Sequence, residues 1–272
     1  MSMKRYKPTT AAQRGKILFK SDNQYSEAPK SLTKGAKRGS GRNNQGKLTV
    51  RHKGGGAKRS LRIIDFSRKD HDIPCRVAGF VHDPYRNADL AHLIYANGKH
   101  SLIVATSKMK LGDVIFAGEN VEPHEGNCLP LANIPVGSVI NNVEINPGAG
   151  AKLARSAGTS ITLMAKDGAY CVVKLPSGEM RYLLSNCKAT MGAVCNEEVR
   201  NERSSSAGRS RHKGIRPTVR GAAMNACDHP HGGGEGKAPV GRKHPMTYKG
   251  KIGRGVKTSS RVSRRTKSLF IR

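Results

Sequence analysis

Short runs of apolar residues, separated by Gly, Pro and Asn, fill the middle of the chain from residue 61 to residue 203. Runs of this length, with turn residues at regular intervals, predict β-strands that form small barrels or a sandwich. The predicted strands fall into two series. The first is 61–66, 75–82, 91–96, 101–105 and a further turn and strand within 110–115, and the second is 138–145, 161–165, 169–175, 179–184 and 189–194.

Turn signals join neighbouring strands within each series. Asn97-Gly98 predicts a tight hairpin in which both central residues adopt positive φ, and Asp167-Gly168 predicts a second turn. The looser stretch 126–137 is interpreted as a connection between the two series. Two units of about 65 residues fit two small barrels better than one sandwich, and units of this size are marginally stable alone.

The segments on either side of these strands differ from them in amino-acid composition. Residues 29–59 and 204–272 are rich in Gly, Lys and Arg, and residues 29–59 show no period of 2 or 3.6. Such segments are expected to take their shape from a partner. The short apolar stretch 17–19 is predicted to be a strand that ties the N-terminal segment to the core.

Charge separates the same three regions. The chain has 49 Lys and Arg against 19 Asp and Glu. Residues 61–203 hold 16 basic and 15 acidic side chains, whereas residues 1–60 hold 16 and 2, and residues 204–272 hold 17 and 2. We call the two basic segments the N-terminal arm (1–60) and the C-terminal arm (204–272). Their uncompensated charge favours a polyanionic partner.

A nucleic acid fits these arms better than a membrane surface. Membrane binding would need an amphipathic helix with Trp, Phe or Leu on one face, and the arms predict none. No run of transmembrane length and no signal-peptide segment is expected. Aromatic residues make up 4% of the chain, too few for base stacking to be the main mode. Folded RNA, recognised through its shape and backbone, is the predicted ligand.

The six cysteines form no CxxC pair and are expected to be reduced thiols. Cys75 and Cys171 lie in apolar runs and are predicted to be buried as small hydrophobic residues. Cys227, His229 and His231 are capable of binding a metal, but they are too closely spaced for a tetrahedral zinc site and lack a second pair. A rigid loop that presents imidazoles to phosphates or 2′-hydroxyls is the better interpretation.

Two enzyme motifs are incomplete. Gly41 to Lys47 has the spacing of a phosphate-binding P-loop, but Leu48 stands where Ser or Thr is needed. The run 231–234, His-Gly-Gly-Gly, is similar to an esterase oxyanion hole, yet no G-x-S-x-G nucleophile elbow occurs in the chain. An enzyme is therefore disfavoured. Composition alone leaves an RNA-binding or architectural protein, such as an RNA chaperone, and does not choose among proteins of this kind.

Several motifs narrow this choice, because together they resemble the universal L-two family of large-subunit ribosomal proteins, in its bacterial or organellar form. They span nearly the whole chain: 41–44, 51–52 with 54–56, 133–138, 153–159, 177–181, 216–220, 221–225 and 228–236. Two positions depart from the family pattern. Cys227 replaces a usual apolar residue, and Tyr248 lies where a tryptophan motif is usual.

The resemblance implies a mainly β protein, with an OB-like barrel (61–125) followed by an SH3-like barrel (126–203) and long irregular basic extensions at both ends (1–60 and 204–272). It implies contacts with large-subunit rRNA near the peptidyl transferase centre, with other ribosomal proteins and with small-subunit rRNA at the interface. Assembly, subunit association and translation are the implied roles. A bacterial cytoplasm or an organelle matrix or stroma is the implied location, and no membrane or small-molecule substrate is implied.

No catalytic residue, resident metal or cofactor is expected, and structural Mg²⁺ shared with the rRNA is left open. His229 is expected to make structural contacts only. The residues expected to bind RNA are Arg38, Arg42, Asn43, Asn44, Arg51, His52, Lys53, Lys58, Arg59, Arg155, Ser156, Thr159, Arg209, Arg211, His212, Lys213, Arg216, Thr218, Arg220, Asn225, His229, His231, Lys237, Arg242, Lys243, His244, Arg254, Arg261, Arg264 and Arg265.

Overall fold

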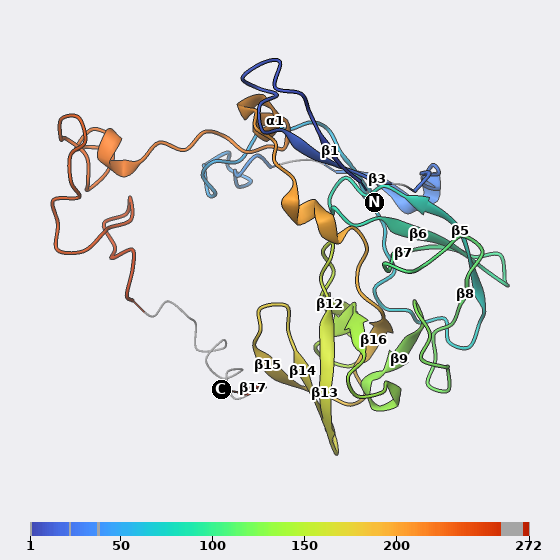
Figure 1. Ribbon diagram of the computed structural model, residues 1–272. Helices are drawn as coiled ribbons and strands as arrows, with labels where there is room; N and C mark the ends of the chain where they lie inside the picture. The colour runs from blue at the N-terminus through green and yellow to red at the C-terminus, as the bar shows by residue number, and fades with distance from the viewer. Residues whose placement is uncertain (1, 22, 37–38, 257–268, 272) are drawn as a thin grey trace. The chain divides into compact units, whose positions relative to one another are not determined.

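The fold was analysed in a computed structural model that describes residues 2–21, 23–36, 39–256 and 269–271. The chain divides into two compact units. Unit 1 comprises Met1–Lys37, Lys58–Ala207 and Ser268–Arg272, and unit 2 comprises Arg38–Ala57 and Gly208–Lys267. Every strand assigned within the described residues belongs to unit 1 (Figure 1). Unit 1 therefore holds the β core that the sequence predicts.

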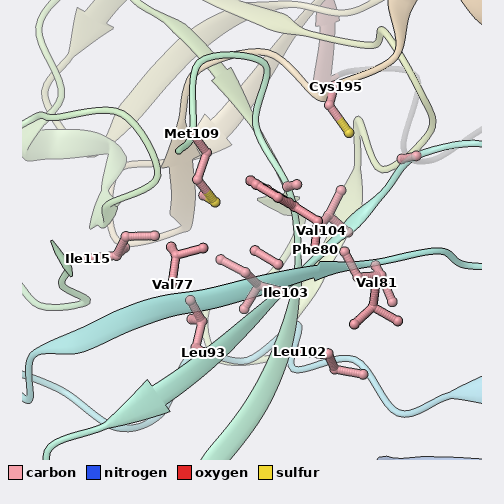
Figure 2. Close-up of a cluster of buried hydrophobic side chains, with 14 of the residues drawn as sticks. Val77, Phe80, Val81, Leu93, Leu102, Ile103, Val104, Met109, Ile115 and Cys195 are labelled. Atoms are coloured by element: carbon pink, nitrogen blue, oxygen red, sulfur yellow. The ribbon is translucent and has the colours of Figure 1, made fainter. Parts of the chain in front are cut away.

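The first barrel is built on a four-stranded antiparallel sheet in the order β7-β6-β5-β8. Its strands are β5 (Cys75–Val81), β6 (Leu90–Tyr95), β7 (His100–Val104) and β8 (Val114–Ile115). Side chains alternate between buried and exposed at the start of β5, which is the period-2 pattern of a strand with one face on a core. Figure 2 shows the resulting cluster, in which Val77, Leu93 and Ile103 are all buried.

The hairpin predicted at Asn97-Gly98 is confirmed, but its turn differs from the prediction. The backbone N–H of Tyr95 donates to Lys99 O (3.0 Å), and that of Gly98 donates to Tyr95 O (2.9 Å). Only Gly98 has a positive φ, +77°. The loop thus has three residues with one glycine in the left-handed conformation, so the prediction of two positive-φ residues was wrong.

The second barrel contains a seven-stranded sheet in the order β17-β15-β14-β13-β10-β16-β9. Its core includes Ile140, Ile161 and Val173, each fully buried. The turn predicted at Asp167-Gly168 is confirmed, with Gly168 at φ +52°. The strands are β9 (Cys128–Pro130), β10 (Val139–Asn141), β13 (Ile161–Asp167), β14 (Tyr170–Lys174), β15 (Met180–Leu184), β16 (Lys188–Met191) and β17 (Phe270–Ile271). This mainly β architecture confirms the expected OB-like and SH3-like barrels.

One predicted connection and two predicted strands need correction. The stretch 126–137 is not a loose connection, because it contains β9, which pairs with β16, and the 3-10 helix η2 (Leu131–Asn133). The predicted strand 138–145 is two strands, β10 and β11 (Val143–Glu144), because Asn142 adopts φ +48° between them. β11 pairs with β12 (Ala151–Leu153). The first predicted strand shortens to β4 (Ser60–Arg62).

The N-terminal arm is more ordered than its composition predicts. The strand predicted at residues 17–19 is confirmed as β2 (Ile17–Lys20), which pairs with β1 (Ser2–Arg5). Farther along, η1 (Lys30–Leu32) leads into β3 (Thr33–Gly35), which pairs with β4. The prediction that the whole of 29–59 takes its shape from a partner was therefore wrong for β3. The backbone groups of this strand form their hydrogen bonds with β4 instead.

All six cysteines are free thiols, and five of them are buried. The predicted burial of Cys75 and Cys171 is confirmed. Cys195 follows the second barrel in sequence but packs in the core of the first, so the chain returns there after β16. Burial raises the pKa of Cys195 to about 12 and that of Cys187 to about 11, which keeps both thiols protonated near neutral pH. Cys227 alone is exposed.

A buried carboxylate anchors the N-terminal arm to the first barrel. Asp89, 1% exposed, accepts hydrogen bonds from the Tyr25 hydroxyl (2.9 Å) and the Asn23 side-chain amide (3.1 Å). The Ser21 hydroxyl also donates to it (3.3 Å). Burial is the main cause that raises the pKa of Tyr25 to about 12, so the phenol remains a donor. The carboxylate thus fixes the segment that links β2 to the barrel.

Replacing Asp89 with alanine is expected to lower the free energy of unfolding by about 2–3 kcal/mol, because three donors lose a shared buried acceptor. Urea denaturation followed by circular dichroism measures the change. Asp70→Ala is the matched control, since the Asp70–Lys99 ion pair is exposed and should contribute much less. Equal losses in the two variants would contradict the anchoring role of Asp89.

Candidate RNA-binding surface

Unit 2 lacks a hydrophobic core within the described residues 39–57 and 208–256. Only Gly214 is buried there, while Leu48 and Val219 are each 56% exposed. The same residues include 15 basic and two acidic side chains. A segment that buries so little apolar surface and carries so much like charge needs a polyanion to stabilise its shape.

Backbone pairing brings the two arms together in unit 2. The N–H of Gly54 donates to Gly214 O (3.0 Å), and the N–H of Arg216 donates to His52 O (3.1 Å). Lys53 and Ile215 form an antiparallel bridge between these bonds. The His52 ring adds a hydrogen bond from Nδ1 to the carbonyl oxygen of Pro217 (3.1 Å). Candidate residues that lie far apart in sequence therefore share one surface.

A six-residue helix, α1 (Ala207–His212), leads into this paired segment. Its exposed or half-buried side chains include three of the predicted RNA-binding residues, Arg209, Arg211 and His212. The prediction that the C-terminal arm is wholly irregular was wrong at this point. None of the helices in the described parts of the chain is long and apolar enough to cross a membrane.

The segment that has P-loop spacing forms a compact turn instead. Arg42 and Leu48 make an antiparallel bridge, and the Asn43 side chain accepts a hydrogen bond from the N–H of Lys47 (2.9 Å). Gly41 has φ +73°, and a Cβ there would overlap the carbonyl oxygen of Val50. Asn43 thus holds the turn together, while the side chains of Arg42 and Asn44 are exposed.

Tyr248, one of the two departures from the family pattern, organises a cationic cluster. The Arg51 guanidinium lies 4.9 Å from the centre of the Tyr248 ring, and Lys249 Nζ lies 5.7 Å from it. Such contacts are cation–π interactions, and the flat guanidinium is well suited to them. The ring orients Arg51, a predicted site residue. Lys249 was missed because it belongs to none of the recognised motifs.

The histidine–glycine loop is closed by its own backbone. The N–H of Gly233 donates to Met224 O (3.1 Å), and the N–H of Gly232 donates to His229 O (2.8 Å). The 3-10 helix η4 (Gly221–Ala223) begins this loop. A Cβ at Gly221 would strike the His229 ring, and one at Gly232 would strike the carbonyl of Asn225. Both glycines are therefore required by close packing.

The hydrogen bonds of the two histidines define what the loop presents. His229 Nδ1 accepts from the N–H of His231 (3.0 Å), and His231 Nε2 accepts from the N–H of Met246 (2.8 Å). A nitrogen that accepts carries no proton, so His229 has its N–H at Nε2. His229 can thus donate to a phosphate or a 2′-hydroxyl. Within the described residues, no three His, Cys, Asp or Glu side chains gather as a metal site would require.

Two protein-family profiles match the chain. Ribosomal Proteins L2, RNA binding N-terminal domain, matches residues 29–117, and Ribosomal Proteins L2, C-terminal domain, matches residues 124–250. Together they span most of the sequence. The chain belongs to the ribosomal protein L2 family. It is accordingly an RNA-binding protein of the large ribosomal subunit, with rRNA and other ribosomal proteins as its partners.

Five predicted RNA-binding residues of this L2-family chain lie in unit 1: Lys58, Arg59, Arg155, Ser156 and Thr159. Arg155 stacks 4.7 Å from the Phe66 ring centre, and desolvation, with help from Arg86, lowers its pKa. Arg59 donates to Pro84 O (3.0 Å) and lies 4.6 Å from the Tyr85 ring centre. Thr159 Oγ1 donates to Ser156 O (2.7 Å). The contacts with Phe66, Pro84 and Tyr85 hold Arg155 and Arg59 in defined orientations.

The remaining predicted residues divide by whether the structure describes them. Arg242 Nε donates to Pro230 O (3.0 Å), which attaches it to the histidine–glycine loop. The others in unit 2 are exposed: Lys213, Thr218, Arg220, Asn225, Lys237, Lys243, His244 and Arg254. Arg38, Arg261, Arg264 and Arg265 lie outside the described residues.

Proposed function

We propose that unit 2 inserts into folded large-subunit rRNA near the peptidyl transferase centre, and that the barrels of unit 1 position it there. The supporting observation is that the described residues of unit 2 are strongly basic, form no hydrophobic core and are joined by backbone pairing between the two arms. Lys and Arg neutralise phosphates and release counterions, which supplies affinity. The chain would thereby support subunit assembly, association with the small subunit and translation.

The role proposed for His229 is a contact, not catalysis. A general base needs an acceptor nitrogen directed at the reacting group, but Nδ1 of His229 already accepts the N–H of His231. The remaining Nε2–H is a donor, suited to holding an rRNA phosphate or 2′-hydroxyl in place. The chain then acts as a structural constituent, without a cofactor except Mg²⁺ shared with the rRNA.

The proposed setting is the ribosome of a bacterium or of an organelle. Small-subunit rRNA at the subunit interface is the further proposed partner. The surface that unit 2 offers contains Arg, Lys, His and glycine backbone, which recognise the sugar–phosphate chain rather than base sequence. Contacts of this kind can be made with large-subunit rRNA and with small-subunit rRNA.

Cys227 provides a direct test of the proposed location, because it lies two residues before His229 and is the one exposed cysteine. An iron–EDTA maleimide attached to Cys227, on protein assembled into large subunits, should cleave rRNA strands of the peptidyl transferase region. A Cys227→Ser variant, treated identically, controls for label on other thiols. Cleavage confined to distant rRNA regions would contradict the proposed location.

A further inference from the structure

Unit 1 contains an open pocket of about 400 Å³ that none of the predicted RNA-binding residues lines. Its lining comes from three short segments: Asp72, Val114 with Phe116, and residues of the loop 120–127. Part of that loop lies between the two family matches, which end at residue 117 and begin again at residue 124. The pocket is therefore a feature of the region where the first barrel leads into the second.

A buried asparagine holds the walls of this pocket together. Asn127, 4% exposed, accepts the N–H of Phe116 at its side-chain oxygen (2.9 Å) and donates from its side-chain nitrogen to Glu122 O (3.0 Å). The N–H of Asp72 donates to Ala117 O (2.8 Å), which fixes the third segment. Because these bonds use backbone groups and a buried amide, the pocket is formed without a ligand, and its charged side chains can be changed without removing them.

Gly118 allows the acidic and apolar parts of the lining to lie close together. A Cβ at Gly118 would overlap the Asp72 carboxylate and would lie 3.1 Å from a Val121 methyl group. Val121 packs against the core of the second barrel, whereas Val114 is 55% exposed. The pocket thus presents a carboxylate beside aliphatic side chains, an arrangement that suits an apolar group with a cation next to it.

The surroundings of the pocket are acidic, although the whole chain has a formal charge of +30. Residues 111–125 contain four acidic side chains and no Lys or Arg. Asp72 and Glu122 are exposed lining residues, and among the described residues no Lys or Arg lines the pocket. The exposed contact between Glu122 and His124 (2.8 Å) contributes little. Carboxylates repel phosphates within about 10 Å at about 0.1 M salt, so this surface is unsuited to RNA.

We propose that the pocket binds a Lys- or Arg-bearing segment of another large-subunit ribosomal protein. An apolar side chain of that segment would pack against Val114 and Val121, and its cations would pair with Asp72 and Glu122. A volume of about 400 Å³, at the lower end of ligand-site volumes, suits one anchoring side chain. Exposed apolar groups rimmed by charged ones are typical of protein interfaces.

The source of the segment follows from the particle in which the chain functions. Proteins that bind rRNA carry basic extensions, of which the two arms of this chain are examples. The acidic pocket attracts such an extension and repels the rRNA itself. The inference needs only membership of the large subunit, and it goes beyond the rRNA contacts proposed for unit 2.

Photocrosslinking inside large subunits tests the proposal. The photoreactive amino acid p-benzoylphenylalanine is introduced in place of Asn120, an exposed lining residue, in the full chain. After assembly into subunits and irradiation, mass spectrometry should identify a Lys- or Arg-bearing segment of another ribosomal protein. Adding Asp72→Asn and Glu122→Gln should lower the yield of that crosslink by about 2- to 30-fold, through loss of two exposed ion pairs. Asparagine tolerates the φ of +59° found at Asp72.

The matched control is Asp167→Asn with Glu179→Gln, which removes the same charge from exposed positions of unit 1 outside the pocket. This pair should leave the crosslink yield unchanged. Equal yields in the two double variants would overturn the proposal. Crosslinks from position 120 to rRNA, to this chain itself or to no protein would also overturn it. The same photoreactive group at Val219, exposed in unit 2, should reach rRNA, and its failure would count against the function proposed for unit 2 alone.

A second measurement uses the unaltered chain. Hydroxyl-radical footprinting should show Val114 and Phe116 protected from oxidation in complete large subunits, but as reactive in the complex of the chain with rRNA alone as in the free chain. Protection by rRNA alone would overturn the protein assignment in favour of RNA. Equal reactivity in the free chain and in complete subunits would show that nothing covers the pocket, which would overturn the proposal as well.

Discussion

Replacing Arg42, Arg216 and Arg220 with glutamine is expected to weaken binding of the full chain to large-subunit rRNA by about 100- to 500-fold at about 0.1 M salt. The estimate assigns one phosphate contact to each arginine, with a slope change of about 0.7–0.9 per contact. All three side chains are exposed in unit 2. Removing three contacts from one surface should thus produce the largest loss of any surface substitution proposed for this chain.

The substitutions leave the backbone pairing in place, although Arg42→Gln removes one exposed side-chain hydrogen bond, from Arg42 to Ser40 O (3.2 Å). The N–H of Arg216 keeps its bond to His52 O, and the bridge between Arg42 and Leu48 is made by the backbone. Filter binding over a series of salt concentrations gives both the affinity and the slope. Replacing Lys108, Lys110 and Lys174 with glutamine is the charge-matched control, because these three lysines are exposed in unit 1 and are not among the predicted RNA-binding residues. A triple variant with an unchanged salt slope would show that these arginines contact no phosphates.

Gly232→Ala is expected to open the histidine–glycine loop and to reduce incorporation of the chain into large subunits by about 30- to 150-fold. The new Cβ would overlap the backbone carbonyls of Asn225 and Met224, neither of which can move without breaking the loop. Loss of the bonds that close the loop corresponds to about 2–3 kcal/mol. Large subunits assembled with equal amounts of tagged variant and untagged chain report the competition directly.

Gly35→Ala is the matched control, because a Cβ at Gly35 meets open space. His229→Ala separates positioning from catalysis, since it removes the donor and leaves the backbone of the loop intact. Assembled subunits with His229→Ala should retain peptide transfer in a single turnover. If Gly232→Ala competed as well as Gly35→Ala, close packing of the loop would be unimportant for assembly.

The strands were predictable wherever burial alone decides the conformation. Alternation in β5 and the apolar run of β14 gave correct strands, because one face of each lies on a core. Local departures from this pattern could not be predicted from the sequence. Asn142 divides the predicted strand 138–145 through its left-handed conformation, and the proline-rich surroundings of β9 concealed an edge strand. Both features depend on pairing with strands elsewhere in the fold rather than on the local pattern of apolar and polar residues.

The candidate surface was predictable in composition but not in arrangement. Excess charge and glycine motifs pointed to both arms, and the residues of the histidine–glycine loop were identified. Nothing periodic indicated that Gly54 pairs with Gly214 or that Arg51 stacks on Tyr248, since such contacts join segments far apart in the chain.

Sedimentation of the chain with purified large subunits tests the central claim most directly. Subunits isolated through a sucrose gradient, first at moderate and then at high salt, are analysed by quantitative mass spectrometry. The account predicts one copy of the chain per large subunit under both conditions, because the proposed contacts of the arms would be embedded in folded rRNA. Its absence from large subunits at both salt concentrations, with the chain recovered at the top of the gradient, would contradict the account.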